Sequence, residues 1–454
     1  MKSSFKSVPG SITAPKGFHA SAVFCDIKRL GTGKGSNKGK KHDLALIFSD
    51  VPATVAGMFT TNQICAAPVK VCVQRVKKGV AQAIVVNSGN ANACTGKQGM
   101  QDALEMARLT AEALVTVTGR RYPLQARHVL VGSTGRIGVN MPMANVRAGI
   151  SAAAPVLGHS PAHAEQAAEA IMTSDTRPKQ IAVEFKLDGK TVRLGGICKG
   201  AGMIQPGMSA TGARPAALPR GLHATMLCFI TTDAAIEVKT LQACLETAVA
   251  QSFNRITVDG DMSTNDTVLV LANGLAENRR LAIGHRLSKD GQTFQAALRH
   301  VCLELAKKIV RDGEGVTRFV TVRVHGARNV ADADAAARAV ANSALVKTSW
   351  FGGDPNWGRI IDALGYSPAK IVEEKVDIGY SAPGSRKVLW SLQRGQPTNA
   401  TFKQLCAAAA PKEFDLHIHL NLGAASALMY ASDLTEEYVE FNKGDVSDPT
   451  TLGG

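Results

Sequence analysis

Short apolar runs alternate with amphipathic stretches along the whole chain. Apolar runs between turn signals predict strands, whereas apolar residues that recur at helical spacing predict helices. These patterns predict strands at 83–86, 128–138, 225–233, 267–272, 318–326 and 414–422, and helices at 101–117, 143–156, 161–172, 238–253, 293–311 and 331–346.

The turns between these segments indicate the fold class. Residues 181–197 predict a hairpin, because Asp188-Gly189 supplies a tight turn between two alternating segments. The strand at 83–86 runs into an Asn- and Gly-rich loop at 87–93, and the strand at 128–138 ends in a Gly-rich turn. Mixed strands and helices with several hairpins favour an α/β protein built as an α+β layered sandwich, rather than a doubly wound parallel sheet.

One segment interrupts the alternation. Residues 209–223 contain two Pro and two Gly and show no periodicity, which predicts a flexible insertion. A Gly-rich approach precedes the insertion, and an apolar strand that starts near Thr225 follows it. By pattern alone, a threonine at the head of a strand is an ordinary β-branched strand residue.

Composition narrows the classes of protein further. The 454 residues correspond to two or three domains, and 45% hydrophobic with 20% charged residues is typical of a globular protein with a large core. The formal net charge of +15 raises the question of nucleic-acid binding. The one dense basic run, Lys34, Lys38, Lys40 and Lys41, lacks interleaved aromatic residues, so it predicts a solvated loop and no nucleic-acid partner.

Several features favour a reduced, cytoplasmic chain without a membrane partner. The nine cysteines show no C-x-x-C pair. Pro9 and Pro15 interrupt the N-terminal segment, and no apolar run approaches the roughly 20 residues that span a bilayer. His417 and His419 share one face of a strand, as a metal-binding pair would, but no third ligand is evident. We therefore expect an exposed polar face there and no metal.

Two segments resemble the signature of the ornithine acetyltransferase (glutamate N-acetyltransferase) family. They are KGAGMIQPGM at 199–208 and ATMLCFITTDA at 224–234. The resemblance covers nearly the whole chain, through further segments at 43–50, 85–96, 131–138, 172–176, 252–267, 311–318 and 352–360. It implies the family's aminopeptidase-like, self-processing N-terminal-nucleophile fold.

The resemblance implies that the chain cuts itself between Ala224 and Thr225. The products would be an α chain of residues 1–224, which carries the insertion, and a β chain of residues 225–454, which begins with the nucleophile Thr225. A threonine hydroxyl needs a base beside it, and an N-terminal threonine carries one in its own α-amine. The pKa of that amine, about 7.7–8.0 when unperturbed, leaves part of it unprotonated near neutrality.

The insertion is the main departure from the family pattern, because it separates Met208 from Ala224-Thr225. It also places a second Ala-Thr pair, at 210–211, directly after Ser209. Thr211 leads into Gly-Ala-Arg-Pro, which cannot continue as a buried strand. Thr225 leads directly into one and is therefore the predicted nucleophile.

The remaining site residues are carried over by resemblance. The Thr134 hydroxyl and the Gly135 backbone N–H would form the oxyanion hole, since a Gly-rich turn can aim such donors. Lys199 would bind a substrate carboxylate and Glu314 a substrate ammonium. The full set of implied substrate contacts is Thr173, Lys199, Thr225, Glu314, Asn442 and Ser447.

The resemblance implies acetyl transfer from N2-acetyl-L-ornithine to L-glutamate in arginine biosynthesis. It also implies no cofactor, acetyl-CoA as a second donor in bifunctional members, and an α2β2 heterotetramer of the cleaved chains. Two alternatives stay open. A related self-processing aminopeptidase or amidase would pass the acyl group to water, and a basic nucleic-acid-binding protein would stay uncut. The use of acetyl-CoA, feedback regulation, the exact oligomeric state and the role of 209–223 stay open as well.

Overall fold

The computed structural model describes residues 5–28, 41–119, 124–213, 226–282 and 287–443. The chain divides into two compact units, each with its own sheet. Unit 1 contains Met1–Asn254, Met262–Ile309 and Gly444–Gly454, and unit 2 contains Arg255–Asp261 and Val310–Lys443.

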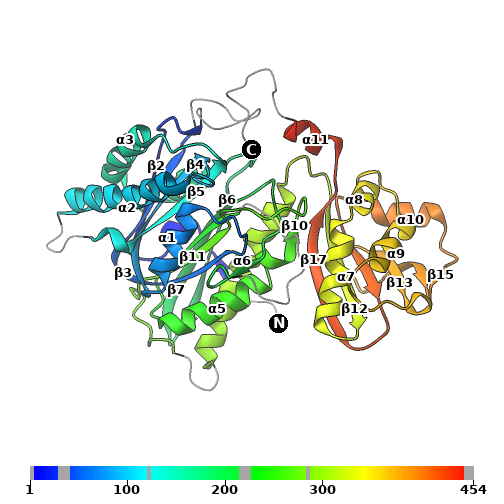
Figure 1. Ribbon diagram of the computed structural model, residues 1–454. Helices are drawn as coiled ribbons and strands as arrows, with labels where there is room; N and C mark the ends of the chain where they lie inside the picture. Colours follow the sequence, from blue (N-terminus) through cyan, green and yellow to red (C-terminus); the bar gives the residue numbers. More distant parts are fainter. Residues whose placement is uncertain (1–4, 29–40, 120–123, 214–225, 283–286, 444–454) are drawn as a thin grey trace. The chain divides into compact units, whose positions relative to one another are not determined.

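A ten-stranded mixed sheet forms the centre of unit 1 (Figure 1). Its strands are β1 Lys6–Ser7, β2 Phe18–Val23, β3 Leu44–Thr60, β4 Val80–Asn90, β5 Val129–Arg136, β6 Lys179–Leu187, β7 Lys190–Lys199, β8 Met208–Ser209, β9 Leu227–Thr232 and β11 Thr267–Ala272. They follow in the order β1-β6-β7-β9-β11-β3-β4-β5, and both β2 and β8 pair with β3.

Helices cover both faces of this sheet because successive strand residues point to opposite sides. The helices of unit 1 are α1 Ala67–Val76, α2 Gly96–Thr118, α3 Met143–Ala153, α4 Pro161–Ala170, α5 Val238–Ala250 and α6 Lys289–Arg311. In β3, Ala45 and Ile47 belong to a core that includes α4. Leu44 and Leu46 belong to a second core with α2 and α3. On this second face the Gln242 side chain of α5 bonds the Gly57 carbonyl oxygen of β3 at 3.1 Å.

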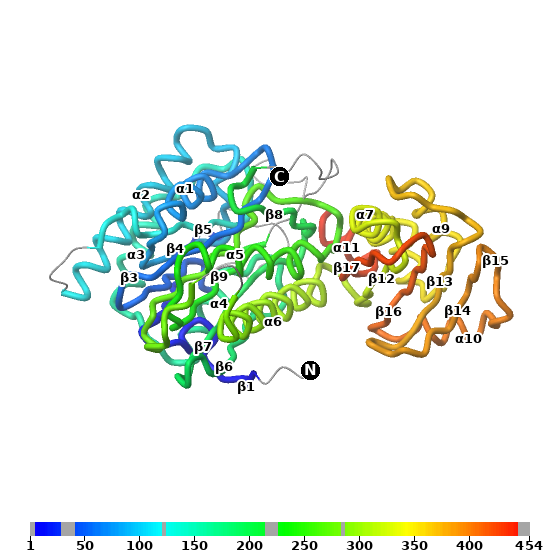
Figure 2. The backbone as a smooth tube through the Cα atoms, turned by 90° about the horizontal axis from the view of Figure 1, so that it is seen from below, coloured from blue at the N-terminus to red at the C-terminus, as the bar shows by residue number. Residues whose placement is uncertain are grey.

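Strand β9 lies inside the sheet, between strands that come from distant parts of the sequence. It pairs antiparallel with β7 and parallel with β11. Strand β11 pairs in turn with β3. The sheet therefore interleaves strands from before and after residue 224, as Figure 2 shows for blue β3, green β9 and its neighbours.

Unit 2 is built on a seven-stranded sheet in the order β10-β17-β12-β16-β13-β14-β15. The strands are β10 Ile256–Thr257, β12 Phe319–Ala327, β13 Asp377–Ser381, β14 Leu389–Gln393, β15 Gln396–Pro397, β16 Glu413–His419 and β17 Ala425–Ser432. The helices are α7 Val330–Asn342, α8 Ala344–Phe351, α9 Trp357–Gly365, α10 Phe402–Ala409 and α11 Glu436–Asn442. Alternate residues of β12 and β16 pack against α7–α10 in a single core.

The layered α/β fold class is confirmed, and the predicted hairpin is β6–β7 with Asp188 and Gly189 both at positive φ. The prediction of one helix at 331–346 was wrong, because the Ser343 side chain accepts the Val346 N–H and starts a second helix, α8. The predicted loop at 87–93 was partly wrong, since β4 continues to Asn90 and pairs with β5.

Two other predicted features are described as follows. At the start of the predicted flexible insertion, Ser209 belongs to β8 and its hydroxyl donates to the Ala213 carbonyl at 2.8 Å. Its residues 214–223 lie outside the described residues. His417 is buried rather than on an exposed face, and its Nε2 lies 2.8 Å from the Ser381 hydroxyl. Burial lowers the pKa of His417 to about 4.

Candidate active site

The predicted nucleophile Thr225 and its partner in the cut, Ala224, lie outside the described residues. The next residue, Met226, is held firmly at the head of β9. Its N–H donates to the Asp266 Oδ1 at 2.5 Å. Its carbonyl accepts the Thr267 N–H at 3.0 Å. The chain directly after position 225 is therefore anchored to the start of β11 by both of its peptide groups.

Asp266 is an unusual buried carboxyl group. Its side chain is fully buried, and its Oδ2 has no hydrogen-bond partner in the described part of the chain. Burial raises the pKa of Asp266 well above its ordinary value, although the Met226 N–H and the positive charge of Lys199 act in the opposite direction. The same burial that raises this pKa favours the protonated form of Asp266 over the carboxylate.

The predicted oxyanion residues lie at the end of β5, next to β4. Thr134 is buried, and its hydroxyl has no hydrogen-bond partner among residues that the structure describes. Gly135 has a φ of 128° and pairs with Gly89 of β4. A β-carbon at Gly135 would lie 2.3 Å from the Gly89 carbonyl carbon, so only glycine fits this close approach. The site therefore offers a buried hydroxyl, without a partner among the described residues, beside a closely packed backbone.

Thr173 and Lys199 are 26 residues apart in sequence and meet in unit 1. The Lys199 ammonium donates to the Thr173 hydroxyl at 2.7 Å. Asp175 lies between Lys199 and a second buried lysine, with its Oδ2 3.7 Å from Lys199 Nζ and its Oδ1 2.5 Å from Lys179 Nζ. The Asp175 oxygens also accept the N–H groups of Thr173 at 3.0 Å and Gly200 at 2.7 Å.

This arrangement explains why Lys199 is held in one place. Burial alone would raise the pKa of Asp175, but the two lysine charges and the Gly200 N–H lower that pKa well below its usual range. Asp175 therefore stays ionised and fixes both predicted substrate contacts. A buried ammonium beside a hydroxyl can bind a carboxylate.

Glu314 and Asn442 meet in unit 2. The Asn442 Nδ2 donates to the Glu314 Oε2 at 2.9 Å. Thr435 caps helix α11 and donates to the Gly315 carbonyl at 2.8 Å, which ties this helix to the turn that carries Glu314. Ser447 lies outside the described residues.

The described site residues thus form three groups. Thr173 lies with Lys199 in unit 1, and Glu314 lies with Asn442 in unit 2. Thr134 and Gly135 lie together at the end of β5. The sequence analysis missed Asp175 and Asp266, although both lie in segments, 172–176 and 252–267, that resemble the family. The signal was that Asp175 is the single charged residue of 170–176 and Asp266 that of 262–276, which fits a buried carboxylate better than a surface charge.

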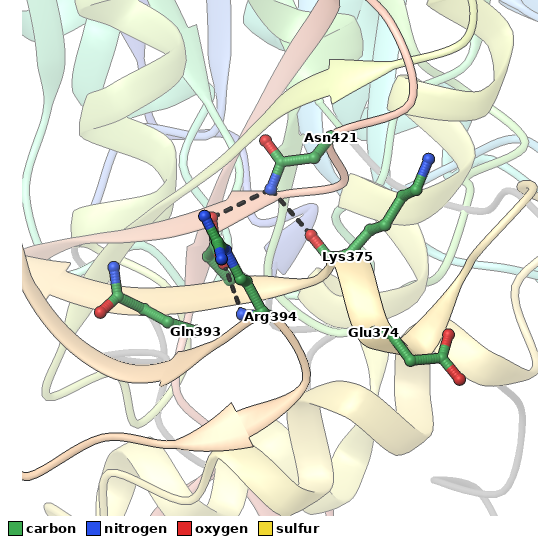
Figure 3. A pocket seen from close by; sticks show the side chains of 6 residues that line it. Glu374, Lys375, Gln393, Arg394 and Asn421 are labelled. Carbon is green, nitrogen blue, oxygen red and sulfur yellow. Dashed lines mark hydrogen bonds between the residues drawn. The ribbon is translucent and has the colours of Figure 1, made fainter.

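A separate pocket of about 740 Å³ in unit 2 contains none of these residues. It is lined by charged and amide side chains, and Figure 3 shows Asn421 bonding the Lys375 carbonyl, at 2.7 Å. Asn421 also donates to Asp377 at 3.0 Å.

The described residues contain no group of three His, Cys, Asp or Glu side chains that could hold a metal ion. None of the helices that the structure describes is both long and apolar enough to cross a membrane. All nine cysteines are unpaired.

Comparison with known proteins identifies the family. The ArgJ family model matches residues 28–444. The arginine biosynthesis bifunctional protein ArgJ of Symbiobacterium thermophilum is 47% identical over 435 residues, which are 95% of this chain and 98% of that protein. The glutamate N-acetyltransferase of Methanocaldococcus jannaschii is 43% identical over 442 residues, 96% of this chain and 98% of that protein.

Among solved structures, the arginine biosynthesis bifunctional protein ArgJ of Bacillus halodurans is 39% identical. The match covers 47% of this chain and 95% of that chain, with a TM-score of 0.43. The two full-length relatives and the family model agree over nearly the whole sequence. The chain belongs to the ArgJ family and is an acyltransferase of arginine biosynthesis.

Proposed function

We propose that the chain transfers acetyl from N2-acetyl-L-ornithine to L-glutamate through an acetyl ester on Thr225, giving L-ornithine and N-acetyl-L-glutamate. The observation that carries the proposal is the position of Thr225 one residue before Met226, whose N–H and carbonyl are both fixed at the head of the central strand β9. The name of one relative, glutamate N-acetyltransferase, supports glutamate as the acetyl acceptor, and the name of another supports a role in arginine biosynthesis.

The active form requires self-cleavage. The Thr225 hydroxyl attacks the carbonyl carbon of Ala224, the C–N bond breaks, and the nitrogen of Thr225 takes up a proton to become an α-amine. Water then hydrolyses the resulting ester and releases Ala224 with a free carboxylate. The new α-amine acts as the base for the same hydroxyl in each later catalytic cycle.

The first half of the cycle forms the acetyl-enzyme. The Thr225 hydroxyl attacks the acetyl carbonyl of N2-acetylornithine while the Thr134 hydroxyl and the Gly135 N–H stabilise the oxyanion. Lys199 and Thr173 bind the substrate carboxylate, and Glu314 with Asn442 and Ser447 binds the distal ammonium. Ornithine leaves, and the α-amine of glutamate then attacks the ester and takes the acetyl group.

Several accompanying properties belong to the same proposal. The exchange balances without a cofactor, since acetyl passes from one amine to Thr225 and from Thr225 to a second amine, with no change of oxidation state. Several relatives are named bifunctional. In a bifunctional enzyme, acetyl-CoA would acylate the same Thr225. We further propose a cytoplasmic α2β2 heterotetramer. A self-processing amidase would differ only in passing the acyl group to water.

The test is the fate of the 47.7 kDa chain on a denaturing gel, followed by N-terminal sequencing of the fragments. We expect two fragments of similar size, the second starting at Thr225. Thr225→Ala should remain one inactive chain. Thr211 is the matched control, because it lies in an exposed turn where its Oγ1 accepts the Ala213 N–H, and Thr211→Ala should be cut normally. Production of N-acetylglutamate rather than free acetate separates transfer from hydrolysis, and a second fragment that starts elsewhere would refute the nucleophile.

A further inference from the structure

Two adjacent side chains at the start of β11 tie the predicted oxyanion strand to the predicted nucleophile strand. Asn265 Nδ2 donates to the carbonyls of Ser133 at 2.8 Å and Ala91 at 2.7 Å. Asp266 accepts the Met226 N–H at 2.5 Å. Asn265 and Asp266 are both essentially fully buried. One dipeptide therefore holds β5 with one side chain and the head of β9 with the other.

Both contacts are made to peptide groups that border the predicted reacting groups. The Ser133 carbonyl shares a planar peptide with the Thr134 N–H, so fixing that oxygen fixes the backbone that leads to Thr134 and Gly135. The Met226 nitrogen belongs to the peptide that joins it to the preceding residue. A constraint on either peptide limits how far the two groups can move apart.

The pair is itself rigid. The Asn265 Oδ1 accepts the Thr264 hydroxyl at 2.5 Å, so its amide uses its oxygen as well as its nitrogen. The Asn265 N–H donates to the Ser263 hydroxyl at 2.9 Å. The Asp266 carbonyl accepts the Thr60 N–H of β3 at 2.8 Å. Side chains locked in this way hold geometry better than side chains on mobile loops.

We propose that Asn265 and Asp266 are positioning residues that hold the Thr134–Gly135 backbone and the head of strand β9 at a fixed separation. The inference rests on the proposed function, in which the oxyanion donors lie at Thr134–Gly135 and the nucleophile directly precedes Met226. The contact from the Met226 N–H needs only an acceptor oxygen at this position, which the side-chain amide of asparagine also supplies. Asp266 Oδ2 is buried and has no hydrogen-bond partner in the described ranges.

The test compares Asn265→Ala, Asp266→Ala and Asp266→Asn. Self-cleavage is followed on gels, and kcat and KM for N2-acetylornithine are measured on the cleaved enzyme. A displacement of about 1 Å between reacting groups costs on the order of 100-fold in rate. We expect both alanine variants to slow cleavage and to lower kcat at least tenfold, with KM within about twofold of wild type. Asp266→Asn keeps an uncharged acceptor and should restore rates to within a few-fold.

Asn278 supplies a matched control at the other end of the same strands. It is also buried, and its amide bonds the Ala235 N–H at 2.8 Å and the Ala235 carbonyl at 3.2 Å. Asn278→Ala should lower the melting temperature as much as Asn265→Ala but leave cleavage and kcat unchanged. If a variant remains uncut, its kcat and KM cannot be measured on a cleaved enzyme, and only its cleavage rate is compared with that of Asn278→Ala.

The inference would be overturned if the folded alanine variants of Asn265 and Asp266 kept wild-type cleavage and kcat, or if only their KM increased. It would also be overturned if Asn278→Ala lost as much kcat as they do. Loss of activity in Asp266→Asn would show that charge, not an uncharged acceptor, is needed at this position, and would overturn it as well. N-terminal sequencing of the wild-type fragments keeps this test separate from that of the proposed function. A second fragment that starts at Thr225, together with unaffected variants, refutes only the positioning role.

Discussion

Replacement of Asp175 by asparagine removes the carboxylate that lies between Lys179 and Lys199. The two lysine side chains are 1% and 3% exposed. At an effective dielectric constant of about 20, the gross attraction is roughly 7 kcal/mol at the shorter distance and about 4 kcal/mol at the longer one. Desolvation of the charges offsets most of this attraction, and the loss of one partner from a buried pair typically costs about 3–5 kcal/mol. We therefore expect Asp175→Asn to destabilise unit 1 by that amount.

The assay is thermal unfolding in a Thr225→Ala background, where the chain is expected to stay in one piece, so that fragment dissociation does not contribute. A loss of about 3–5 kcal/mol corresponds to a decrease in melting temperature of roughly 5–8 °C for a unit of this size. Glu440→Gln is the control, because Glu440 pairs with Lys443 at 3.1 Å on the surface, with side chains 65% and 61% exposed. Such pairs contribute about 0–1 kcal/mol.

The pH dependence provides a second check. The folded-state pKa of Asp175 lies below its unfolded value, so its stabilising effect is fully present above the unfolded value of about 4. The effect is lost only as the pH falls below that value toward the folded pKa. The difference between wild type and variant should therefore stay constant between about pH 5 and 8. A decrease in melting temperature no larger than that of Glu440→Gln would refute the reasoning.

Two further predictions concern Gly135 and His417. Gly135→Ala should lower kcat by about 100-fold or more, because the new β-carbon would lie 2.6 Å from the Asn90 nitrogen and force β5 away from β4. The control is Gly138→Ala, where the φ is also positive but the space around the glycine is open. This variant should keep kcat within a few-fold of wild type. His417→Gln should flatten the loss of stability on acidification, measured by urea unfolding from pH 7 to 4.5. Burial lowers the pKa of His417 to about 4 in the folded state, against roughly 6.5 in the unfolded state. Between pH 7 and 4.5 the unfolded state therefore binds more protons than the folded state. Acidification over this range should decrease the stability of the wild type by at most about 3 kcal/mol. An unchanged pH slope in the variant would contradict this assignment.

Local patterns in the sequence predicted most of the elements, but not how they end or which side chains meet. The apolar run at 267–272 is the observed β11, because a short buried strand needs no partner to be recognised. The 17-residue strand β3 was not predicted, since Asp50 interrupts its apolar pattern and its pairing with β4 shifts between Phe48 and Ala53. The break at Ser343 depends on a single capping hydroxyl within an Ala-rich stretch.

In the site too, some residues could be predicted from the sequence, but the contacts between distant residues could not. Lys199 and Thr173 were predicted by resemblance, and the structure brings them together. The role of Asn265 could not be predicted, because its amide reaches carbonyls 174 and 132 residues away. The role of Asp175 could not be predicted either, because it depends on the burial of this side chain between two lysines. Non-local hydrogen bonds of this kind leave no periodic trace in a sequence.

The interleaved sheet has a consequence for the protein if it is cut as proposed. Removal of the peptide bond before Thr225 would leave β9 hydrogen-bonded to β7 on one side and to β11 on the other. Neither product could leave without exposing long unpaired strand edges, which are prone to aggregate. Scission would therefore be a one-way maturation step, since a denatured pair of fragments would have to find each other again in solution. Recombinant production from two separate genes should accordingly give insoluble material unless both products are synthesised in the same cell.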